Sequence, residues 1–339
     1  MALARDPDDD AFRALLACPS CGGRLRAPLV CAACGAVHAA PAGVYDLRRP
    51  GASDDVTETV RRFYTEAPFP GYPPRFSLSG LRARAARSQF ASLLDAAIPG
   101  DARILEIGCG TGQMSLYLAS ADRIVIGADI TRASLELAAA AAARFRLPRV
   151  RFVETDLFHP GLAARSFDVV YCSGVLHHTP DPPAAFAALA RLARPGGILV
   201  LGLYNAFARI PHRLRRAVAR ATRFKLIPGD PVLRDRAAEP ARRQAWLRDQ
   251  YLHPEEHRHT LGEVQAWFRA NGVEYLRAYP SSTLAEEPLS ASHLFAPAGD
   301  SWGFEQFLIQ LGWAARLGHE GGLFVTIGRA GAVAAAASP

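Results

Sequence analysis

The chain has 339 residues, of which 50% are hydrophobic and 21% are charged, and its formal net charge is +7 at pH 7. This length and apolar content are enough to bury one large core or two modest ones, and they exclude wholesale disorder. No run of about 18 apolar residues could cross a bilayer, and the N-terminus lacks the charged-then-apolar pattern of a signal peptide. We therefore expect a soluble, cytoplasmic protein with no transmembrane segment.

Four of the six cysteines form two matching pairs near the N-terminus, Cys18-Pro-Ser-Cys21-Gly and Cys31-Ala-Ala-Cys34-Gly. Four thiolates in this pairing suit a tetrahedral zinc ion, and the nine residues between the pairs are enough for a hairpin. A closed set of four ligands indicates a structural metal, because catalytic zinc keeps an open position. The alternative is four reduced cysteines without metal. We predict structural Zn2+ in a small module over residues 12–47.

A polar, Pro/Gly-containing link at residues 48–55 is followed by a mostly helical lead-in over residues 56–98. Within it, the four prolines and one glycine of residues 63–74 exclude a continuous helix. The aromatic side chains of this stretch are candidates for a lid that excludes water from a site, and the alternative is packing against a sheet. They are Phe63, Tyr64, Phe69 and Tyr72, of which Tyr64 and Tyr72 are candidate substrate contacts.

From residue 99 onward, short apolar runs alternate with helical stretches, which predicts βαβ units and a parallel sheet. The expected strands cover residues 103–107, 123–128, 150–154, 168–172 and 198–203, and the helices between them cover 114–120, 134–146 and 183–192. This alternation stops over residues 204–258, which we interpret as a helical insertion in a domain spanning residues 99–329.

The pattern resumes at Thr260, which is followed three residues later by Glu263 and begins a helix that ends at Gly272. Residues 273–279 and 323–327 are expected to be two closing strands. We predict a disordered tail over residues 330–339.

A basic segment opens the insertion. Between Leu203 and Gly229 there are seven basic residues and no acidic residue. The charge of this segment, +7, therefore equals the net charge of the whole chain. Apolar residues recur at helical spacing in this stretch, so we expect an amphipathic helix over residues 209–225. Such a helix could make peripheral contact with an acidic membrane, a nucleic acid or an anionic substrate. The alternative is a packed helix with a solvated arginine face.

A glycine-rich turn, Glu106-Ile-Gly108-Cys-Gly110-Thr-Gly112, directly follows the first expected strand of the parallel sheet. Glycines let the backbone approach a ligand closely, and the next helix offers its N-terminal amides. Gln113 stands where a dinucleotide-binding turn would carry another glycine. The turn therefore favours a cofactor without a diphosphate.

Acidic residues follow the ends of successive expected strands. Glu106 precedes the turn, Asp129 ends the second strand and Asp156 follows the third. Ligands of open parallel sheets bind outside the carboxyl ends of the strands, so these carboxylates should face one crevice. Asp129 could take both hydroxyls of an adenosine ribose, and Asp156 could reach the adenine amino group. The alternative for each residue alone is a helix N-cap.

Several segments resemble, in order and spacing, the successive motifs of class I S-adenosylmethionine-dependent methyltransferases. They are residues 104–112, Asp129, residues 155–156, residues 167–182 and residues 194–197. This resemblance implies an α/β, Rossmann-like, doubly wound sheet of seven strands whose last strand is antiparallel, with S-adenosylmethionine as cofactor. The N-terminal module resembles the small zinc ribbons that precede some methyltransferase domains.

The resemblance also implies a set of cofactor-binding residues. They are Glu106, Gly108, Cys109, Gly110, Gly112, Asp129, Ile130, Asp156, Leu157, Cys172 and Ser173. Methyl transfer depends mainly on alignment, and a base is needed only when the acceptor must lose a proton. His177 and His178 are the candidate catalytic bases, although the histidine at position 178 often has a structural role in this superfamily.

His253 is a further candidate substrate contact in the insertion. Together with His257, His259 and two nearby glutamates it makes a second metal conceivable, and the alternative is a polar loop. We predict methyl transfer to a small molecule, because the aromatic lead-in and the insertion could enclose a pocket. The alternatives are an RNA or protein methyltransferase that uses the zinc ribbon and the basic helix for binding, and a non-catalytic cofactor-binding protein.

Overall fold

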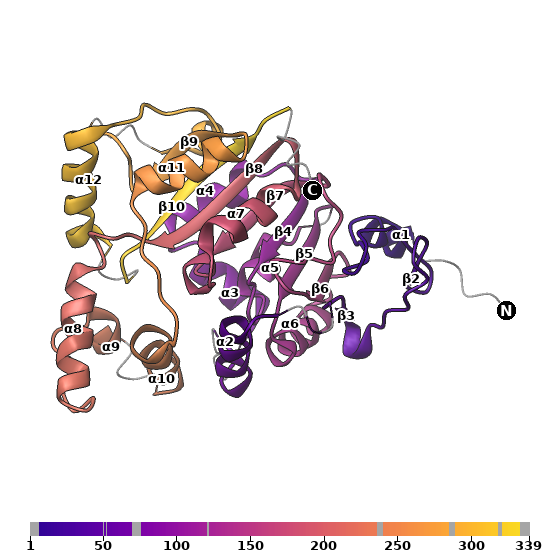
Figure 1. The fold of residues 1–339 in the computed structure, drawn as a ribbon, viewed down its shortest axis with the longest axis horizontal. Coiled ribbons are helices and arrows are strands. Elements are labelled where there is room, and N and C mark those ends of the chain that lie inside the picture. The colour runs from indigo at the N-terminus through magenta and orange to yellow at the C-terminus, as the bar shows by residue number, and fades with distance from the viewer. Residues whose placement is uncertain are drawn as a thin grey trace.

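The computed structural model describes residues 7–49, 51, 53–69, 76–120, 122–235, 240–284, 289–317 and 321–332. At its centre lies a sheet of eight strands in the order β3-β6-β5-β4-β7-β8-β10-β9 (Figure 1). Alternate side chains of each strand enter one of two hydrophobic cores: Leu105 and Val170 enter the first, and Ile104 and Val169 enter the second. Because successive side chains of a strand point to opposite faces, the two cores lie on opposite sides of the sheet.

The seven strands expected from the sequence are all present. They are β4 (Arg103–Ile107), β5 (Ile124–Asp129), β6 (Val150–Glu154), β7 (Phe167–Ser173), β8 (Ala193–Tyr204), β9 (Val273–Tyr279) and β10 (Leu323–Ala330). The last strand, β10, pairs antiparallel with both β8 and β9, whereas the pairings among β4, β5, β6, β7 and β8 are parallel. The predicted fold class is therefore confirmed.

An eighth strand, β3 (Val44–Asp46), extends this sheet and was not expected from the sequence. It pairs in parallel with β6, with Val44 opposite Phe152 and Asp46 opposite Glu154. β3 comes from the N-terminal module, whose other elements are α1 (Pro7–Arg13), β1 (Leu25–Arg26), β2 (Val30–Cys31) and a short turn at Pro41–Gly43. The module is therefore joined to the large domain through the backbone of the main sheet.

The N-terminal module also shares a hydrophobic core with the large domain. Phe12, Leu16 and Leu47 are buried in the core that contains Phe167 and Leu199 of the sheet. Two backbone hydrogen bonds add to this packing. The amide of Ala17 donates to the carbonyl of Gly161 at 3.1 Å, and the amide of Ala163 donates to the carbonyl of Leu15 at 2.9 Å. The division at residues 48–55 remains a prediction from composition.

Helices cover the two faces of the sheet. α7 (Pro182–Ala190), α11 (Leu261–Ala270) and α12 (Gly303–Arg316) pack on the first core. The lead-in helices α3 (Leu78–Ala85) and α4 (Gln89–Ala97) pack on the second core with α5 (Gln113–Leu118) and α6 (Arg132–Arg144). The predicted capping box is present in α11, where Thr260 and Glu263 cap each other. No helix of the described residues is long and apolar enough to cross a membrane.

The insertion is helical, as expected. It contains α8 (Ile210–Ala221), α9 (Pro231–Asp235), α10 (Pro240–Leu247) and a single π-helical turn, η3 (Arg248–Leu252). The orientation of α8 agrees only in part with the alternative of a packed helix with a solvated arginine face, since Arg213 and Arg220 are exposed but the apolar stripe is exposed as well. The apolar residues Ile210, Leu214 and Val218 are exposed, whereas Arg209 is fully buried and Arg216 is half-buried. The inner side of α8 is therefore polar.

Arg209 explains this orientation. Its guanidinium lies over the Tyr204 ring, 3.7 Å from the centroid, and pairs with Glu256 at 2.9 Å. It also donates to the side chain of Gln250 at 2.5 Å and to the backbone carbonyl of Gly321 at 2.6 Å. Burial disfavours the charged form of Glu256, but the hydrogen bond and charge of Arg209 hold the pKa of Glu256 at about 2. A buried ion pair thus ties the insertion to the end of β8.

Replacing Arg209 should destabilise the protein strongly. In Arg209→Met, the buried carboxylate of Glu256 loses its main partner, so we expect the free energy of unfolding in urea to fall by roughly 3–5 kcal/mol. Arg213→Met removes an exposed arginine of the same helix and should change it by less than about 0.5 kcal/mol. Equal effects of the two changes would contradict the assigned role.

Since the pKa of Glu256 is depressed from 4.5, the stability contributed by the pair should be present above pH 4.5 and lost as the pH falls toward 2.

Candidate functional site

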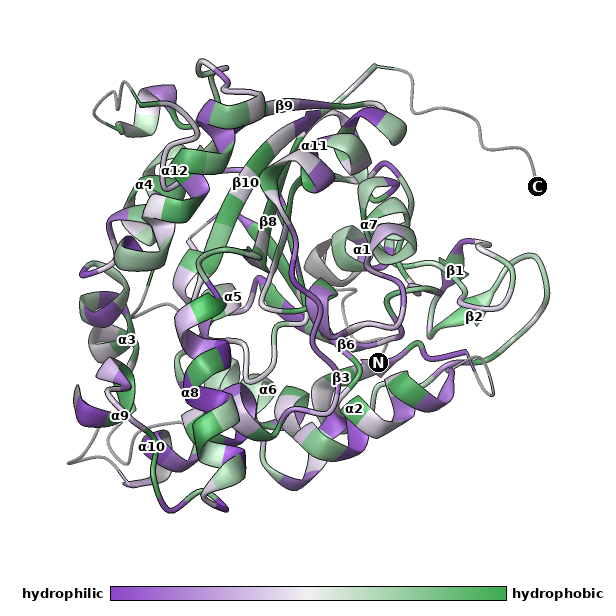
Figure 2. Cartoon of the chain, turned by 60° about the vertical axis from the view of Figure 1, so that its left-hand side comes forward, coloured by the Kyte–Doolittle hydropathy of each residue, from purple (hydrophilic) through white to green (hydrophobic). Residues whose placement is uncertain are grey.

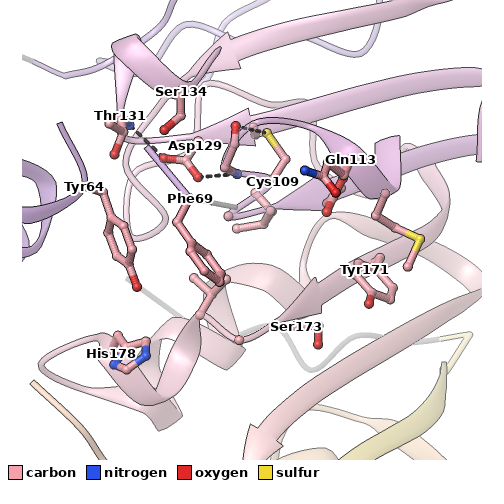
Figure 3. A pocket seen from close by; sticks show the side chains of 18 of the residues that line it. Tyr64, Phe69, Cys109, Gln113, Asp129, Thr131, Ser134, Tyr171, Ser173 and His178 are labelled. Carbon is pink, nitrogen blue, oxygen red and sulfur yellow. Dashed lines mark hydrogen bonds between the residues drawn. The ribbon is translucent and has the colours of Figure 1, made fainter. Parts of the chain in front are cut away.

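A cavity of about 680 Å3 lies at the carboxyl ends of the parallel strands. Its floor is formed by residues at the ends of neighbouring strands: Glu106 of β4, Asp129 of β5, Asp156 after β6 and Ser173 of β7. Figure 3 shows Asp129, Cys109 and Gln113 together on one side of this cavity and Ser173 on another. The structure therefore brings the three predicted carboxylates to one crevice.

The glycine-rich turn connects β4 to α5 beneath the cavity. The backbone amides of Gly108 and Cys109 both donate to the carbonyl of Ala128, at 2.7 and 3.1 Å. Gly108 has a φ of +70°, and a Cβ added there would lie 2.1 Å from a methyl carbon of Val175. Only glycine fits this close approach without a shift of the neighbouring chain.

Asp129 is held in place by backbone amides. Its two carboxylate oxygens accept hydrogen bonds from Gly110 and Thr131, each at 2.8 Å, as Figure 3 shows. Asp156 accepts from the amide of Phe158 at 2.8 Å and from the hydroxyl of Ser53 at 3.0 Å. Both carboxylates thus have a local structural role while they also line the cavity.

Glu106 is a buried carboxyl group whose ionisation is altered by its surroundings. Burial raises its pKa to about 7, although the hydroxyl of Ser115 donates a hydrogen bond to its carboxylate. Near neutral pH this group is therefore balanced between its neutral and charged forms. A cation bound beside it would favour the charged form, because opposite charge offsets the cost of burial.

The lead-in and the insertion form the roof of the cavity. Tyr64 and Phe69 line it from the lead-in, where Tyr64 belongs to α2 (Asp55–Glu66). The amide of Thr111 in the glycine-rich turn donates to the carbonyl of Phe69 at 3.3 Å. The hydroxyl of Tyr64 donates to a carboxylate oxygen of Asp249 at 2.7 Å. The two roof segments are thus bonded to each other and to the floor.

Asp249 belongs to a polar network that the sequence did not single out. The side-chain amide of Gln250 donates to Asp249 at 2.7 Å and to the hydroxyl of Tyr204 at 2.6 Å. Tyr204 lines the cavity from the end of β8, and Asp249, Gln250 and Trp246 line it from the insertion. No spacing in the sequence distinguishes them, because they reach the cavity only through the docking of η3 and α10 over the sheet. From this region, sequence reasoning had selected only His253 as a substrate contact.

His178 is the predicted base that lines the cavity. Its Nδ1 lies 2.6 Å from the backbone carbonyl of Glu255, and a carbonyl can only accept, so Nδ1 carries the proton and Nε2 is left as an acceptor. Burial lowers the pKa of His178 to about 4, so the ring is neutral at physiological pH. Figure 3 places it near Tyr64 and Phe69.

The other predicted residues have varied positions. Gly108, Cys109, Gly110, Ile130 and Leu157 line the cavity, whereas Gly112 and Cys172 lie behind its lining. His177 is fully buried beneath the ring of Tyr204 and does not line the cavity, so its placement does not fit direct contact with an acceptor. His253 stacks on His178 with 3.6 Å between ring centroids. It is not among the residues that line the cavity, so it contacts His178 on the side away from the cavity. Tyr72 lies outside the described residues.

The four N-terminal cysteines form a separate centre. Their Sγ atoms all lie within 4.8 Å of one another. The two pairs have equivalent turns: the amide of Gly22 donates to the carbonyl of Cys18 at 2.8 Å, and that of Gly35 donates to Cys31 at 3.0 Å. This arrangement of four soft, converging donors fits tetrahedral zinc.

No second group of this kind is present among the residues that the structure describes. His257 pairs with Glu255, His259 pairs with Glu263, and His253 lies in the aromatic cluster with His178. The histidines of the insertion therefore do not converge on a metal, which corrects the suggestion of a second metal site.

Comparisons with known proteins agree with the positions of the motifs. Residues 105–201 match a family described as a methyltransferase domain. A trans-aconitate 2-methyltransferase of Methylobacterium radiotolerans is 35% identical over 162 residues, which cover 46% of this chain and 60% of that protein. A ubiquinone biosynthesis O-methyltransferase of Hahella chejuensis is 34% identical over 155 residues, which cover 45% of this chain and 63% of that protein.

A solved structure of magnesium protoporphyrin IX methyltransferase from Synechocystis, with bound SAM, is also similar. The alignment has 17% sequence identity and a TM-score of 0.46, and it covers 82% of this chain and 99% of that chain. The chain spans about three-fifths of the length of the curated relatives that it matches.

Proposed function

We propose that residues 105–201 act as a class I S-adenosylmethionine-dependent methyltransferase domain. On this basis, the chain transfers a methyl group from S-adenosylmethionine to a small-molecule acceptor. The observation that carries the proposal is the convergence of Glu106, Asp129 and Asp156 in one roofed cavity. When bound, S-adenosylmethionine supplies an electrophilic methyl group on a positively charged sulfur. The residues of the chain bind it, orient the acceptor and exclude water.

The carboxylates that line the cavity support this cofactor, because it carries positive charge. Glu106 and the glycine-rich turn would hold the methionine end, with the backbone at Cys172 and Ser173 nearby. Asp129 with Ile130 would hold the ribose, and Asp156 with Leu157 the adenine. A buried Glu106 with a pKa of about 7 suits a cationic ammonium group, since a nearby cation favours its charged form.

A small acceptor is favoured over RNA by the charge of the cavity. Among its described lining residues there are four carboxylates, counting Asp249 in the roof, and one cationic side chain, Arg84. A polyanion would be repelled from such a surface, and described residues of α2, α10 and η3 line the cavity opposite the carboxyl ends of the strands. A cavity of this size lies within the range of about 300–1,000 Å3 that is usual for small-molecule sites.

His178 is the residue that we expect to receive a proton from the acceptor. Its Nε2 is unprotonated, and its ring is fixed by the hydrogen bond of Nδ1 and by the stack on His253. The low pKa of His178 makes it a weak base, so its contribution depends on position more than on basicity. Tyr64 lies nearby as a substrate contact, with its hydroxyl oriented by Asp249.

We further propose that the four cysteines hold structural Zn2+. Their thiolates converge at a spacing that a single tetrahedral ion can bridge, and no position is left open for a substrate. The ion would fix the two turns relative to β1 and β2, and thereby the segment that leads to β3.

The cofactor assignment is tested by calorimetric titration with S-adenosylhomocysteine. Asp129→Ala removes the carboxylate expected to accept two ribose hydroxyls, so we expect binding to weaken by about 1.5–3 kcal/mol, or roughly 10- to 150-fold. Glu136→Ala, on the exposed side of the following helix α6, should leave the affinity unchanged. An unaltered affinity in Asp129→Ala, with folding verified by thermal unfolding, would refute the assignment.

The role of His178 is tested by His178→Phe, which keeps an aromatic ring but removes the nitrogen acceptor. With a catechol, which must lose a proton, kcat should fall by roughly 10²- to 10⁴-fold while the affinity for S-adenosylhomocysteine stays unchanged. With trans-aconitate, an already ionised acceptor, kcat should change little. His293→Phe, at an exposed position outside the cavity lining, is the control. An unchanged kcat with the catechol would exclude His178 as the base.

The metal assignment is tested by measuring zinc in the purified protein. We expect one equivalent per chain, and its loss in the double variant Cys18→Ser, Cys21→Ser, together with a lower temperature of thermal unfolding, because the ligand set is halved. His38→Ala, which changes a nearby residue outside the ligand set, should keep the zinc. A metal-free wild-type protein with the same unfolding temperature as the zinc-loaded form would disprove a structural ion.

A further inference from the structure

The outer side of α8 carries an exposed apolar stripe. Ile210, Leu214 and Val218 follow each other at four-residue spacing and are 40%, 65% and 37% exposed. The inner side of the same helix holds His212 and Ala219, and His212 lies 2.9 Å from the backbone carbonyl of Gln250 through its Nε2. An amphipathic helix of a water-soluble domain normally turns its apolar stripe toward the core. In α8 this arrangement is reversed.

α12 shows the same feature on a larger scale. Phe304, Phe307, Leu308 and Leu311 stand at helical spacing and are 39–73% exposed, and Trp302 just before the helix is 84% exposed. The opposite side of the helix buries Ile309, Gln310 and Trp313. α12 is therefore packed on the domain through one side and presents a second apolar side to the outside.

The two stripes adjoin. The ring of Phe207, just before α8, meets the ring of Phe307 on α12 edge to face, with 5.2 Å between centroids. In Figure 1 α12 and α8 stand one above the other along the left edge of the molecule, with the sheet to their right. Figure 2, turned toward this edge, shows hydrophobic residues along both helices. We call the exposed apolar residues of this surface the outer apolar face. They are Ile210, Leu214, Val218, Trp302, Phe304, Phe307, Leu308 and Leu311.

Cations border this face on the side of α8. Arg213, Arg220, Arg223 and Lys225 are exposed, and the chain has no acidic residue between Leu203 and Gly229. Arg209 and Arg216 do not belong to this set, because both pair with the buried carboxylate of Glu256. The exposed positive charge therefore lies next to the apolar stripe and is not neutralised within its own segment.

We propose that the outer apolar face binds the surface of a membrane that contains anionic phospholipids, with α8 and α12 lying in the interface. Leucine, phenylalanine and tryptophan beside arginine and lysine are the composition of helices that enter the headgroup region. A nucleic acid would meet the cations but leave the apolar stripes in water. A second copy packed through α8 would bring like charges together. A lipid surface satisfies both the apolar and the charged residues.

The experiment is sedimentation of the full chain with vesicles in the absence of any methyl donor or acceptor. We expect binding to vesicles of phosphatidylcholine with roughly one-third phosphatidylglycerol, and weaker binding to phosphatidylcholine alone. Arg213→Gln with Arg220→Gln should lower the partition coefficient roughly fivefold per charge removed. Leu214→Ser and Leu308→Ser should each lower it by about tenfold. Because no turnover is measured, this result is independent of the proposed activity.

The matched control is Leu137→Ser, at a 44% exposed leucine on α6 outside this face. It should bind vesicles like the wild type, and circular dichroism and thermal unfolding verify that all variants are folded. Equal binding by the wild type and Leu214→Ser would overturn the proposal, as would absence of binding to the anionic vesicles. A concentration-dependent dimer that Leu214→Ser abolishes, in a wild type that ignores vesicles, would assign the face to a second copy instead.

Discussion

The buried guanidinium of Arg209 is the contact on which the shape of the cavity depends. It is bonded to Gln250 in η3, to Glu256 beyond it and to Gly321 before β10, and it covers Tyr204 at the end of β8. A charge enclosed in this way is tolerated only while its partners remain in place, because an unpaired buried ion is very costly. The insertion is therefore fixed on the sheet, and the side chains of Asp249 and Gln250 are fixed in the same cavity as the carboxylates at the strand ends. Tyr64 completes the roof through its bond to Asp249.

The insertion thus has two surfaces of opposite character. Its inner surface combines a small hydrophobic cluster around Trp246 and Tyr251 with hydrogen bonds to the sheet and to the lead-in, and its outer surface on α8 is apolar and cationic. The insertion therefore contributes residues both to the lining of the cavity and to the exposed apolar face. The seven basic residues of this segment divide accordingly: Arg209 and Arg216 neutralise Glu256, and most of the others remain in solvent.

The sequence predicted those features that depend on local periodicity. Residues 150–154 and 273–279 form strands at the expected bounds, since a short apolar run and its flanking turns are encoded within each segment. Glu106, Asp129 and Asp156 could be placed in one crevice because parallel strands end at the same edge. The orientation of α8 could not be predicted, because its apolar spacing defines a stripe without saying which side is buried. The orientation depends on the ion pair between Arg209 and Glu256, which lies 47 residues further along the chain. β3 was missed because three residues are too few to show a period, and Asp249 because tertiary docking alone brings it to the cavity.

The pairing of β3 with β6 also bears on how the chain avoids self-association. Without β3, the parallel strand β6 would end the sheet, and its backbone amides and carbonyls would be free to pair with another chain. β3 is short and follows the two cysteine turns, and its last residue, Asp46, pairs with Arg132 at 3.6 Å. The small cysteine module therefore closes the open side of the large domain. Loss of its order would expose part of the shared core and the unpaired backbone of β6, so that damage at the cysteines would lead to aggregation.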